Sequence, residues 1–151
     1  MGVYVHLFVE KRAKKENEGN WDYCSFNGEF SKKVYRMYDE LFYKLSLGKR
    51  DMPSDLGAVS FNAFYQECLI DEKGKFYNFS SSEVIEHNGK KYKPKIPGCD
   101  IGWCTSEELQ ECYNKVFKKE KDLEWFAIIK YMQALEGDNE NNVRAVFWFE
   151  D

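Results

Sequence analysis

The feature that most constrains this fold is the alternation of side-chain character at both ends of the chain. Along residues 3–11 every second side chain is apolar: Val3, Val5, Leu7 and Val9. The positions between them are aromatic or ionisable: Tyr4, His6, Phe8 and Glu10. Residues 142–151 alternate in the same way, and a period of two residues predicts a β-strand. We therefore expect both ends to be strands of one sheet, with no tail beyond either.

The first half of the intervening sequence predicts a hairpin strand and two helices. Residues 21–26 are expected to return antiparallel to the first strand. Apolar residues at helical spacing over 34–45 predict a helix that Ser31 caps and Gly48 ends. Ser60 is expected to cap a shorter helix that carries the apolar residues Phe61, Phe64, Tyr65, Cys68 and Leu69.

The second half predicts a hairpin followed by two further helices. Residues 71–74 are expected to form a turn and 76–79 a short strand, and Asn88-Gly89 is typical of a tight hairpin turn. Residues 94–104 are predicted to be an irregular connector. Thr105 and Glu108 then have the spacing of a capping box that opens a helix. A broader apolar arc over 121–136 predicts a central helix, which Gly137 ends.

Together these patterns predict one α+β domain over residues 1–151. Its mainly antiparallel sheet would contain both terminal strands and pack against three to four helices on one face. A chain of 151 residues is the size of one ordinary domain.

Composition excludes several classes of protein. The net charge of −4 gives no electrostatic reason to expect a nucleic-acid polymer as partner. No apolar run reaches the roughly 20 residues that span a bilayer, and no leader sequence is evident, so no membrane association is expected. The five cysteines are an odd set, which indicates reduced thiols in a cytoplasmic protein. Self-association is left open.

Motifs for metal, cofactor or covalent chemistry are missing. The spacing of Cys99, Cys104 and Cys112 matches no standard zinc motif, and only His6 and His87 supply imidazoles. The sequence has no phosphate-binding glycine loop and no nucleophile elbow. We therefore predict no catalytic residue, no metal site and no cofactor.

One candidate ligand surface remains. If the two terminal strands are neighbours, one face of the sheet carries four candidate ligand-binding residues: Tyr4, His6, Arg144 and Trp148. Aromatic rings with an arginine suit a planar or anionic ligand, by stacking and by forked hydrogen bonds. Helices that cover this face are the alternative.

Four short segments, in order, are similar to one family of small, uncharacterised phage and prophage proteins: 1–11, 38–42, 103–109 and 144–151. The first begins Met-Gly and continues Val-His-Leu-Phe, where family members typically open Met-Gly-Cys-Asp-Ile-His. The second and third resemble that family's Asn-Tyr-Asp-Leu-Phe and Ser-Trp-Leu-Thr-Leu-Glu-Glu-Leu segments. The last, Arg-Ala-Val-Phe-Trp-Phe-Glu-Asp, is similar to its Arg-Ile-Val-Phe-Trp-Phe-Asp-Asn.

Two departures from the family pattern bear on chemistry. The family places an aspartate two residues before the histidine, where this chain has Tyr4. It also often has an Asp- and His-rich stretch before the tryptophan, where this chain has 97–102. If the family is metal-dependent, this member has lost most of the ligands, and the resemblance then implies a binding scaffold.

The resulting hypothesis is a phage-encoded, non-enzymatic binding protein that acts in the host cytosol, in counter-defence. It would sequester a small anionic ligand such as a signalling nucleotide. Asp100 and Trp103 join the four strand residues in the predicted site. Two alternatives remain: an inhibitor that masks a host protein by direct contact, and a residual hydrolase that uses His6, Cys99 and Asp100.

Overall fold

The fold is that of a computed structural model, which describes residues 3–12, 21–24, 30–34, 37, 40, 53–69, 71–74, 84–96, 101–137 and 142–150. Its main antiparallel sheet contains five strands: β1 (Val3–Arg12), β2 (Trp21–Tyr23), β3 (Phe30–Val34), β7 (Ile101–Cys104) and β8 (Val143–Glu150). The strand order is β2-β1-β8-β7, and β3 pairs with β1 as well. The predicted α+β class is confirmed.

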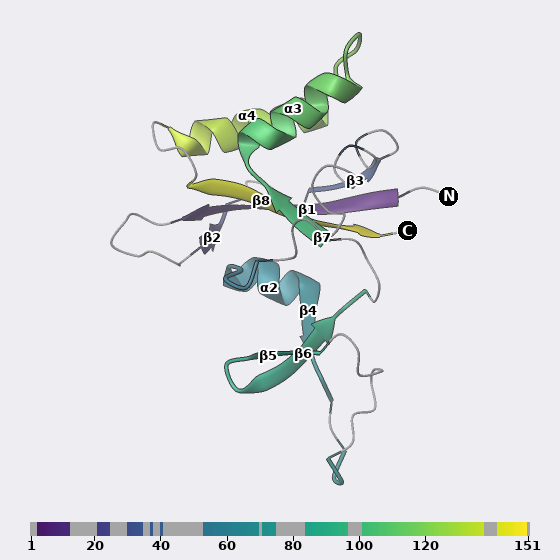
Figure 1. The fold of residues 1–151 in the computed structure, drawn as a ribbon, viewed down its shortest axis with the longest axis vertical. Coiled ribbons are helices and arrows are strands. Elements are labelled where there is room, and N and C mark those ends of the chain that lie inside the picture. Colours follow the sequence, from purple (N-terminus) through teal and green to yellow (C-terminus); the bar gives the residue numbers. More distant parts are fainter. Residues whose placement is uncertain are drawn as a thin grey trace.

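The two terminal strands are direct neighbours at the centre of this sheet. Their antiparallel register runs from Tyr4 opposite Glu150 to Lys11 opposite Val143. The N-terminal end of β1 and the C-terminal end of β8 therefore lie side by side (Figure 1). The prediction that both ends belong to one sheet is confirmed.

Helices cover both faces of the main sheet, whereas the sequence predicted one covered face. Helices α3 (Ser106–Val116) and α4 (Leu123–Glu136) form a layer on one side, and α2 (Ala58–Phe64) lies on the other (Figure 1). Strand β8 is buried at every residue from Val143 to Phe149. A central strand with apolar residues on both faces needs cover on both sides, because exposed apolar area is unfavourable in water.

The core between the sheet and the α3–α4 layer is apolar throughout. On the sheet it is built by residues of β1 and β8 that point to the same side: Val5, Leu7, Val9, Ala145, Phe147 and Phe149. From the helices it receives Leu109, Cys112, Trp125, Ile129 and Met132. Leu123 in the first turn of α4 is 72% exposed, so α4 is an outer-layer helix and not the central one predicted.

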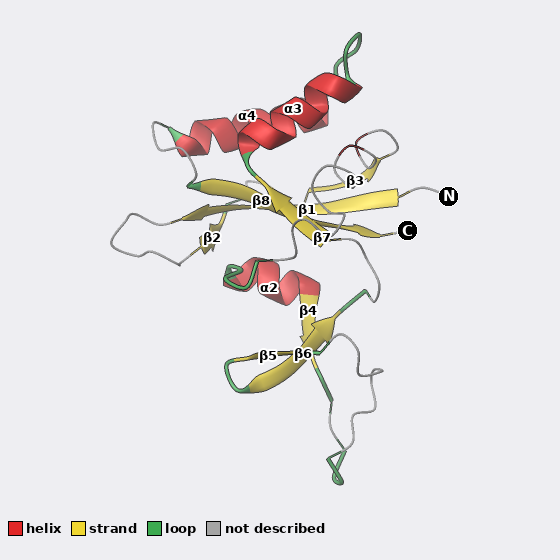
Figure 2. Cartoon of the chain, viewed as in Figure 1, coloured by secondary structure: helices red, strands yellow, loops and turns green. Residues whose placement is uncertain are grey.

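A second, smaller antiparallel sheet lies beyond α2 (Figure 2). It consists of β4 (Tyr65–Glu67), β6 (Lys90–Pro94) and β5 (Ile85–His87), in that order. The β5–β6 hairpin turns at Asn88 and Gly89, whose φ angles are 53° and 77°. Both angles are positive, which is what a two-residue hairpin turn of this kind requires, so the predicted hairpin is confirmed.

Several smaller predictions are also confirmed. Of the return strand predicted over 21–26, Trp21–Tyr23 form β2 and pair antiparallel with β1, and residues 25–26 lie outside the described part of the chain. Residues 71–74 form a turn that the Gly74 N–H closes on the Asp71 carbonyl at 3.0 Å. Thr105 and Glu108 form the capping box of α3, and Gly137, with φ at 56°, follows α4. The strand predicted at 76–79 lies outside the described residues.

The first predicted helix begins later than the sequence suggested. Ser31, predicted to cap it, lies within β3 opposite His6. Met37 and Glu40 are helical, and the other residues predicted for this helix beyond Val34 lie outside the described part of the chain. The edge of β1 supplies hydrogen-bond partners to residues 30–34, and such tertiary pairing overrides local helical spacing.

Two further boundaries differ. Helix α2 is capped by Gly57 and contains Ser60, and the chain becomes strand β4 at Tyr65, where the sequence predicted more helix. The predicted connector 94–104 includes strand β7, which pairs with β8 from Ile101 opposite Trp148 to Cys104 opposite Ala145. A four-residue strand carries little periodic signal, and its pairing depends on a neighbour far away in the sequence.

Within the described residues, none of the helices combines the length and apolar character needed to cross a membrane.

Candidate functional site

The strand register gathers polar side chains at one end of the α2-facing side of the main sheet. Glu10 of β1 lies opposite Arg144 of β8, and Arg12 lies opposite Trp21 of β2. Because side chains alternate along a strand, Glu10 and Arg12 point to the same face. The segment 53–57, which leads into α2, covers this end of the sheet.

A buried carboxylate anchors that segment. The Glu10 side chain has no exposed surface, and its Oε2 accepts a 2.8 Å hydrogen bond from the Gly57 backbone N–H. Its Oε1 accepts a 2.9 Å hydrogen bond from Arg144 Nε and lies 2.8 Å from Arg144 Nη2. A buried carboxylate is costly unless it is paired and hydrogen-bonded, and here both oxygens are engaged.

Asp55 completes a second set of contacts to Arg144. Its Oδ1 accepts a 3.0 Å hydrogen bond from Arg144 Nη1, and its backbone carbonyl accepts one of 3.2 Å from Nη2. Its Oδ2 accepts a 2.9 Å hydrogen bond from Trp21 Nε1. Partial burial raises the pKa of Asp55, but the hydrogen bonds and charge of Arg144, with the Trp21 bond, outweigh burial and lower it.

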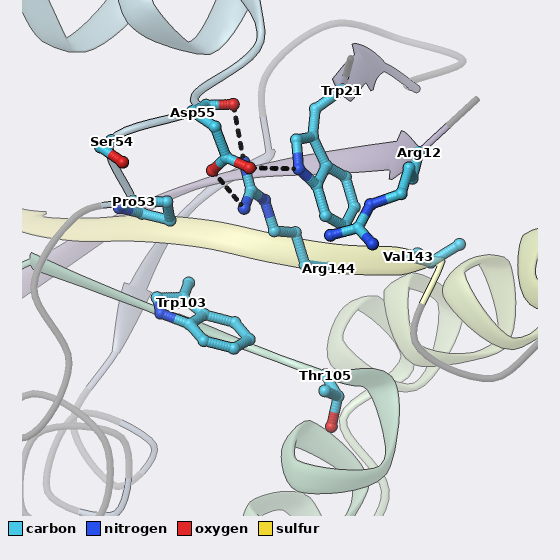
Figure 3. A pocket seen from close by; sticks show the side chains of 9 residues that line it. All are labelled: Arg12, Trp21, Pro53, Ser54, Asp55, Trp103, Thr105, Val143 and Arg144. Atoms are coloured by element: carbon cyan, nitrogen blue, oxygen red, sulfur yellow. Dashed lines mark hydrogen bonds and ion pairs between the residues drawn. The ribbon is translucent and has the colours of Figure 1, made fainter. Parts of the chain in front are cut away.

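Trp21 lies between two arginines (Figure 3). Arg144 Cζ is 3.9 Å from the Trp21 ring centroid, and Arg12 Cζ is 4.7 Å from it. Both distances are typical of cation–π contacts. The Trp21 side chain is only 7% exposed, so the arginines already use the ring surface that a ligand would need for stacking.

These residues line a pocket of about 530 Å³ (Figure 3). Its walls come from β1, β2, β7, β8, the segment before α2 and the residue that caps α3. The described lining residues are Arg12, Trp21, Pro53, Ser54, Asp55, Trp103, Thr105, Val143 and Arg144. A volume in this range, with aromatic walls and a few polar groups, is typical of small-molecule sites.

The charges around the pocket are not equivalent. Arg144 is 6% exposed and is balanced by the carboxylates of Glu10 and Asp55. Arg12 is exposed at the pocket wall, and within the described part of the chain its guanidinium contacts Trp21 but no carboxylate. Among the described charged residues of the pocket, Arg12 is therefore the cation available to an anion.

The structure divides the predicted site residues between two places. Arg144 and Trp103 line the pocket. His6 and Trp148 lie on the same face of the sheet but opposite each other further along β1 and β8. With about 3.4 Å per residue, the four residues from His6 to Glu10 separate the two places by roughly 14 Å.

The stretch of sheet between these places is packed. Phe64 of α2 lies over Trp148, with ring centroids 5.0 Å apart, and Phe8 stacks on Trp148 at 5.4 Å. Trp148 is 4% exposed. The face that carries His6 and Arg144 is therefore covered in one part and hollowed in another. Helix α2 covers its middle, and the pocket lies at the Arg144 end.

His6 and Tyr4 lie apart from the pocket. His6 stacks on Trp148 at 5.6 Å, and its Nε2 lies 2.7 Å from Glu150 Oε2. Tyr4 is 45% exposed and lies opposite Glu150 at the end of the strand pair. Asp100 lies outside the described residues.

The predicted site included only Trp103 and Arg144 of the described lining residues, and it did not include Arg12, Trp21 and Asp55, whose charges and ring shape the pocket. The alternation of β1 places Arg12 on the same face as Glu10, and the hairpin partner brings Trp21 beside it, so these two carried a usable signal. The sequence held no such signal for Asp55, because a loop residue comes close to the sheet only through the path that the folded chain takes.

The described residues hold no group of three or more His, Cys, Asp or Glu side chains arranged to hold a metal ion. Burial raises the pKa of the Cys24 thiol, and it does the same for Cys68. A raised pKa keeps a thiol protonated at neutral pH and makes it a weak nucleophile. The alternative hydrolase would use Cys99 together with His6 and Asp100. Cys99 lies outside the described residues.

Comparison of the chain with protein-family models, with curated proteins and with solved structures finds no significant match.

Proposed function

We propose that this protein is a non-enzymatic binding protein whose pocket takes a small, planar, anionic ligand. The observation that carries the proposal is the position of Arg12. Its guanidinium is exposed at the wall of the pocket, and no carboxylate among the described residues neutralises it. A guanidinium can donate forked hydrogen bonds to a phosphate or carboxylate, so an anionic group is the complement of this position.

The aromatic contribution to binding comes from Trp103. Trp103 lines the pocket and is only partly buried, whereas Trp21 is covered by the two arginines. A planar ring that enters the pocket would stack on the Trp103 indole while its anionic group pairs with Arg12. Stacking of a nucleobase on an aromatic side chain contributes about 1–3 kcal/mol in single-stranded nucleic-acid complexes.

The biological setting of the proposal rests on the resemblance to phage and prophage proteins. A phage-encoded binding protein in the host cytosol would act in counter-defence if its ligand were a signalling nucleotide. Nucleotides combine a planar base with phosphate, which is the chemistry that Trp103 and Arg12 complement. Nucleoside monophosphates are therefore the first ligands to test.

The test is a thermal-shift screen of the protein with AMP, GMP, CMP and UMP, followed by calorimetric titration of each nucleotide that raises Tm. A ligand that binds only the native state stabilises it by mass action. We expect at least one monophosphate to raise Tm, and Arg12→Ala to weaken its binding about tenfold or more. The neutral nucleoside should bind wild type and Arg12→Ala equally.

Lys118→Ala is the matched control. It removes the same charge from an exposed side chain beyond the far end of α3, roughly 16 Å of helix from the pocket. It should bind nucleotides as wild type does. Failure of all four monophosphates, or equal loss of binding in both variants, would contradict the proposal and favour an inhibitor that contacts a host protein.

A further inference from the structure

We infer that the pocket selects a ligand with a single phosphate group and a hydrogen-bond donor on its planar ring, the class of amino-bearing nucleoside monophosphates. This inference rests on the proposed function and narrows it. It depends on the placement of one available cation and one available acceptor around the same pocket.

Among the described residues, two cations line the pocket, Arg12 and Arg144. Arg144 contacts Glu10 through Nε and Nη2 and Asp55 through Nη1 and Nη2, so each of its three nitrogens already contacts an oxygen of the chain. One guanidinium, that of Arg12, therefore remains for the ligand.

The pocket wall also contains a carboxylate. Asp55 lines the pocket with a side chain that is 43% exposed, and its lowered pKa keeps it ionised at neutral pH. A second or third phosphate would extend from the Arg12 end without meeting another unpaired cation among the described residues, and it would add negative charge to a pocket that already holds the Asp55 carboxylate. Like charges that approach in a partly desolvated site repel each other, so extra phosphates weaken binding.

The Asp55 carboxylate also determines which hydrogen bonds the pocket can form with a ligand. A carboxylate has about four acceptor positions. Within the described residues, the Asp55 side chain accepts one bond at Oδ1, from Arg144, and one at Oδ2, from Trp21, and its own backbone N–H helps to lower its pKa. Because the side chain is partly exposed and lines the pocket, its remaining acceptor capacity suits an N–H donor of the ligand, such as an exocyclic amine of a nucleobase.

The geometry thus gives the ligand a direction: amine toward Asp55, ring on Trp103, phosphate at Arg12. A triphosphate matches the ring and amine positions but carries excess charge. A monophosphate whose base lacks the amine matches the charge and ring but leaves Asp55 without its donor.

Calorimetric titration with four probes tests this assignment: AMP, ADP, ATP and purine riboside monophosphate, which is AMP without its amine. We expect AMP to bind most tightly, with ATP weaker by about tenfold or more. The probe without the amine should also be weaker by about tenfold, the range of one hydrogen bond to a charged group.

The variant Asp55→Asn tests the origin of this order. It retains side-chain size but removes the charge, so the difference between AMP and ATP should shrink. Glu86→Gln, which removes an exposed carboxylate from β5 in the small sheet, is the matched control and should leave the order unchanged. Circular dichroism and Tm of both variants confirm that they are folded.

The outcomes separate the two proposals. ATP binding as tightly as AMP, or equal binding of the probe without the amine, would overturn this inference and leave a nucleotide-binding pocket standing. Retention of the full AMP preference in Asp55→Asn would overturn the role of that carboxylate. If none of the four probes binds, this inference fails, and the proposed function fails with it only if GMP, CMP and UMP do not bind either.

Discussion

The two faces of the main sheet are built from alternate residues of the same two strands, yet different interactions hold each face to its covering layer. On the α3–α4 side, residues such as Leu7 and Phe147 belong to a large buried apolar cluster. On the α2 side, the next residues along include Glu10 and Arg144, which bind the segment 53–57 through charged hydrogen bonds. The α3–α4 side is stabilised by non-directional burial, whereas the α2 side combines a smaller aromatic cluster at Phe64 and Trp148 with directional contacts that also shape a pocket.

This difference has a consequence for function. A cavity in an apolar interface is costly, because it removes packing contacts from the residues around it. The charged hydrogen bonds of Glu10 and Arg144 hold the segment 53–57 at a few atoms only, which leaves space between those contacts. The pocket lies on the anchored face for that physical reason.

Removal of Arg144 should have the largest effect. Arg144→Met leaves the carboxylate of Glu10 buried without its cation, so we expect the free energy of unfolding to fall by about 3–5 kcal/mol. Urea unfolding monitored by tryptophan fluorescence measures the change.

The double variant Glu10→Leu with Arg144→Met should recover part of that loss. It removes both buried charges. The Gly57 N–H then lacks the acceptor that Glu10 supplied, which accounts for about 1–3 kcal/mol of remaining destabilisation. A fall in the free energy of unfolding below about 1 kcal/mol for Arg144→Met alone is the range of an exposed ion pair. That result would contradict the conclusion that buried charged contacts stabilise the α2 side.

Truncation of the apolar face should cost nearly as much by another mechanism. Ile129 of α4 has no exposed surface, and Ile129→Ala is expected to lower the free energy of unfolding by about 2–5 kcal/mol through lost burial and a residual cavity. Because no titrating group is involved, this loss should be the same at neutral and mildly acidic pH. Urea unfolding at both pH values tests this, and a strong pH dependence would contradict it.

Gly57→Ala should destabilise the anchored face by a smaller amount. A Cβ at this position would lie 2.5 Å from the Trp21 carbonyl oxygen and 2.7 Å from Glu10 Oε2, so the segment must shift. We expect a loss of about 1–3 kcal/mol, the usual range for overpacking, measured by urea unfolding. Asn62→Ala, on the exposed side of α2, is the control and should cost nothing.

The smallest expected effect is the acid sensitivity that Asp55 contributes. Its folded-state pKa lies below the ordinary value of 3.8, so its contribution is present above that value and is lost as pH falls through the lowered pKa. The side chain is 43% exposed, and solvent screening limits the contribution to below about 1 kcal/mol. Asp55→Asn should flatten the stability profile in this acid window, and an unchanged slope would argue against the contact.

Local sequence determined much of this fold. The alternation of Val5, Leu7 and Val9 predicted β1, and the capping pair Thr105 and Glu108 predicted the start of α3. Asn88-Gly89 predicted a hairpin turn. Each is a short-range rule, because a period, a cap and a turn depend on residues within one element.

Tertiary structure decided where the site lies. The register of β1 with β8 set Glu10 against Arg144 and moved His6 roughly 14 Å away. The path of residues 53–57 brought Asp55 to Arg144, and the edge of β1 drew Ser31 into a strand. Alternation assigns a residue to a face, but register and loop path assign its neighbours, since those depend on pairing between segments far apart in the chain.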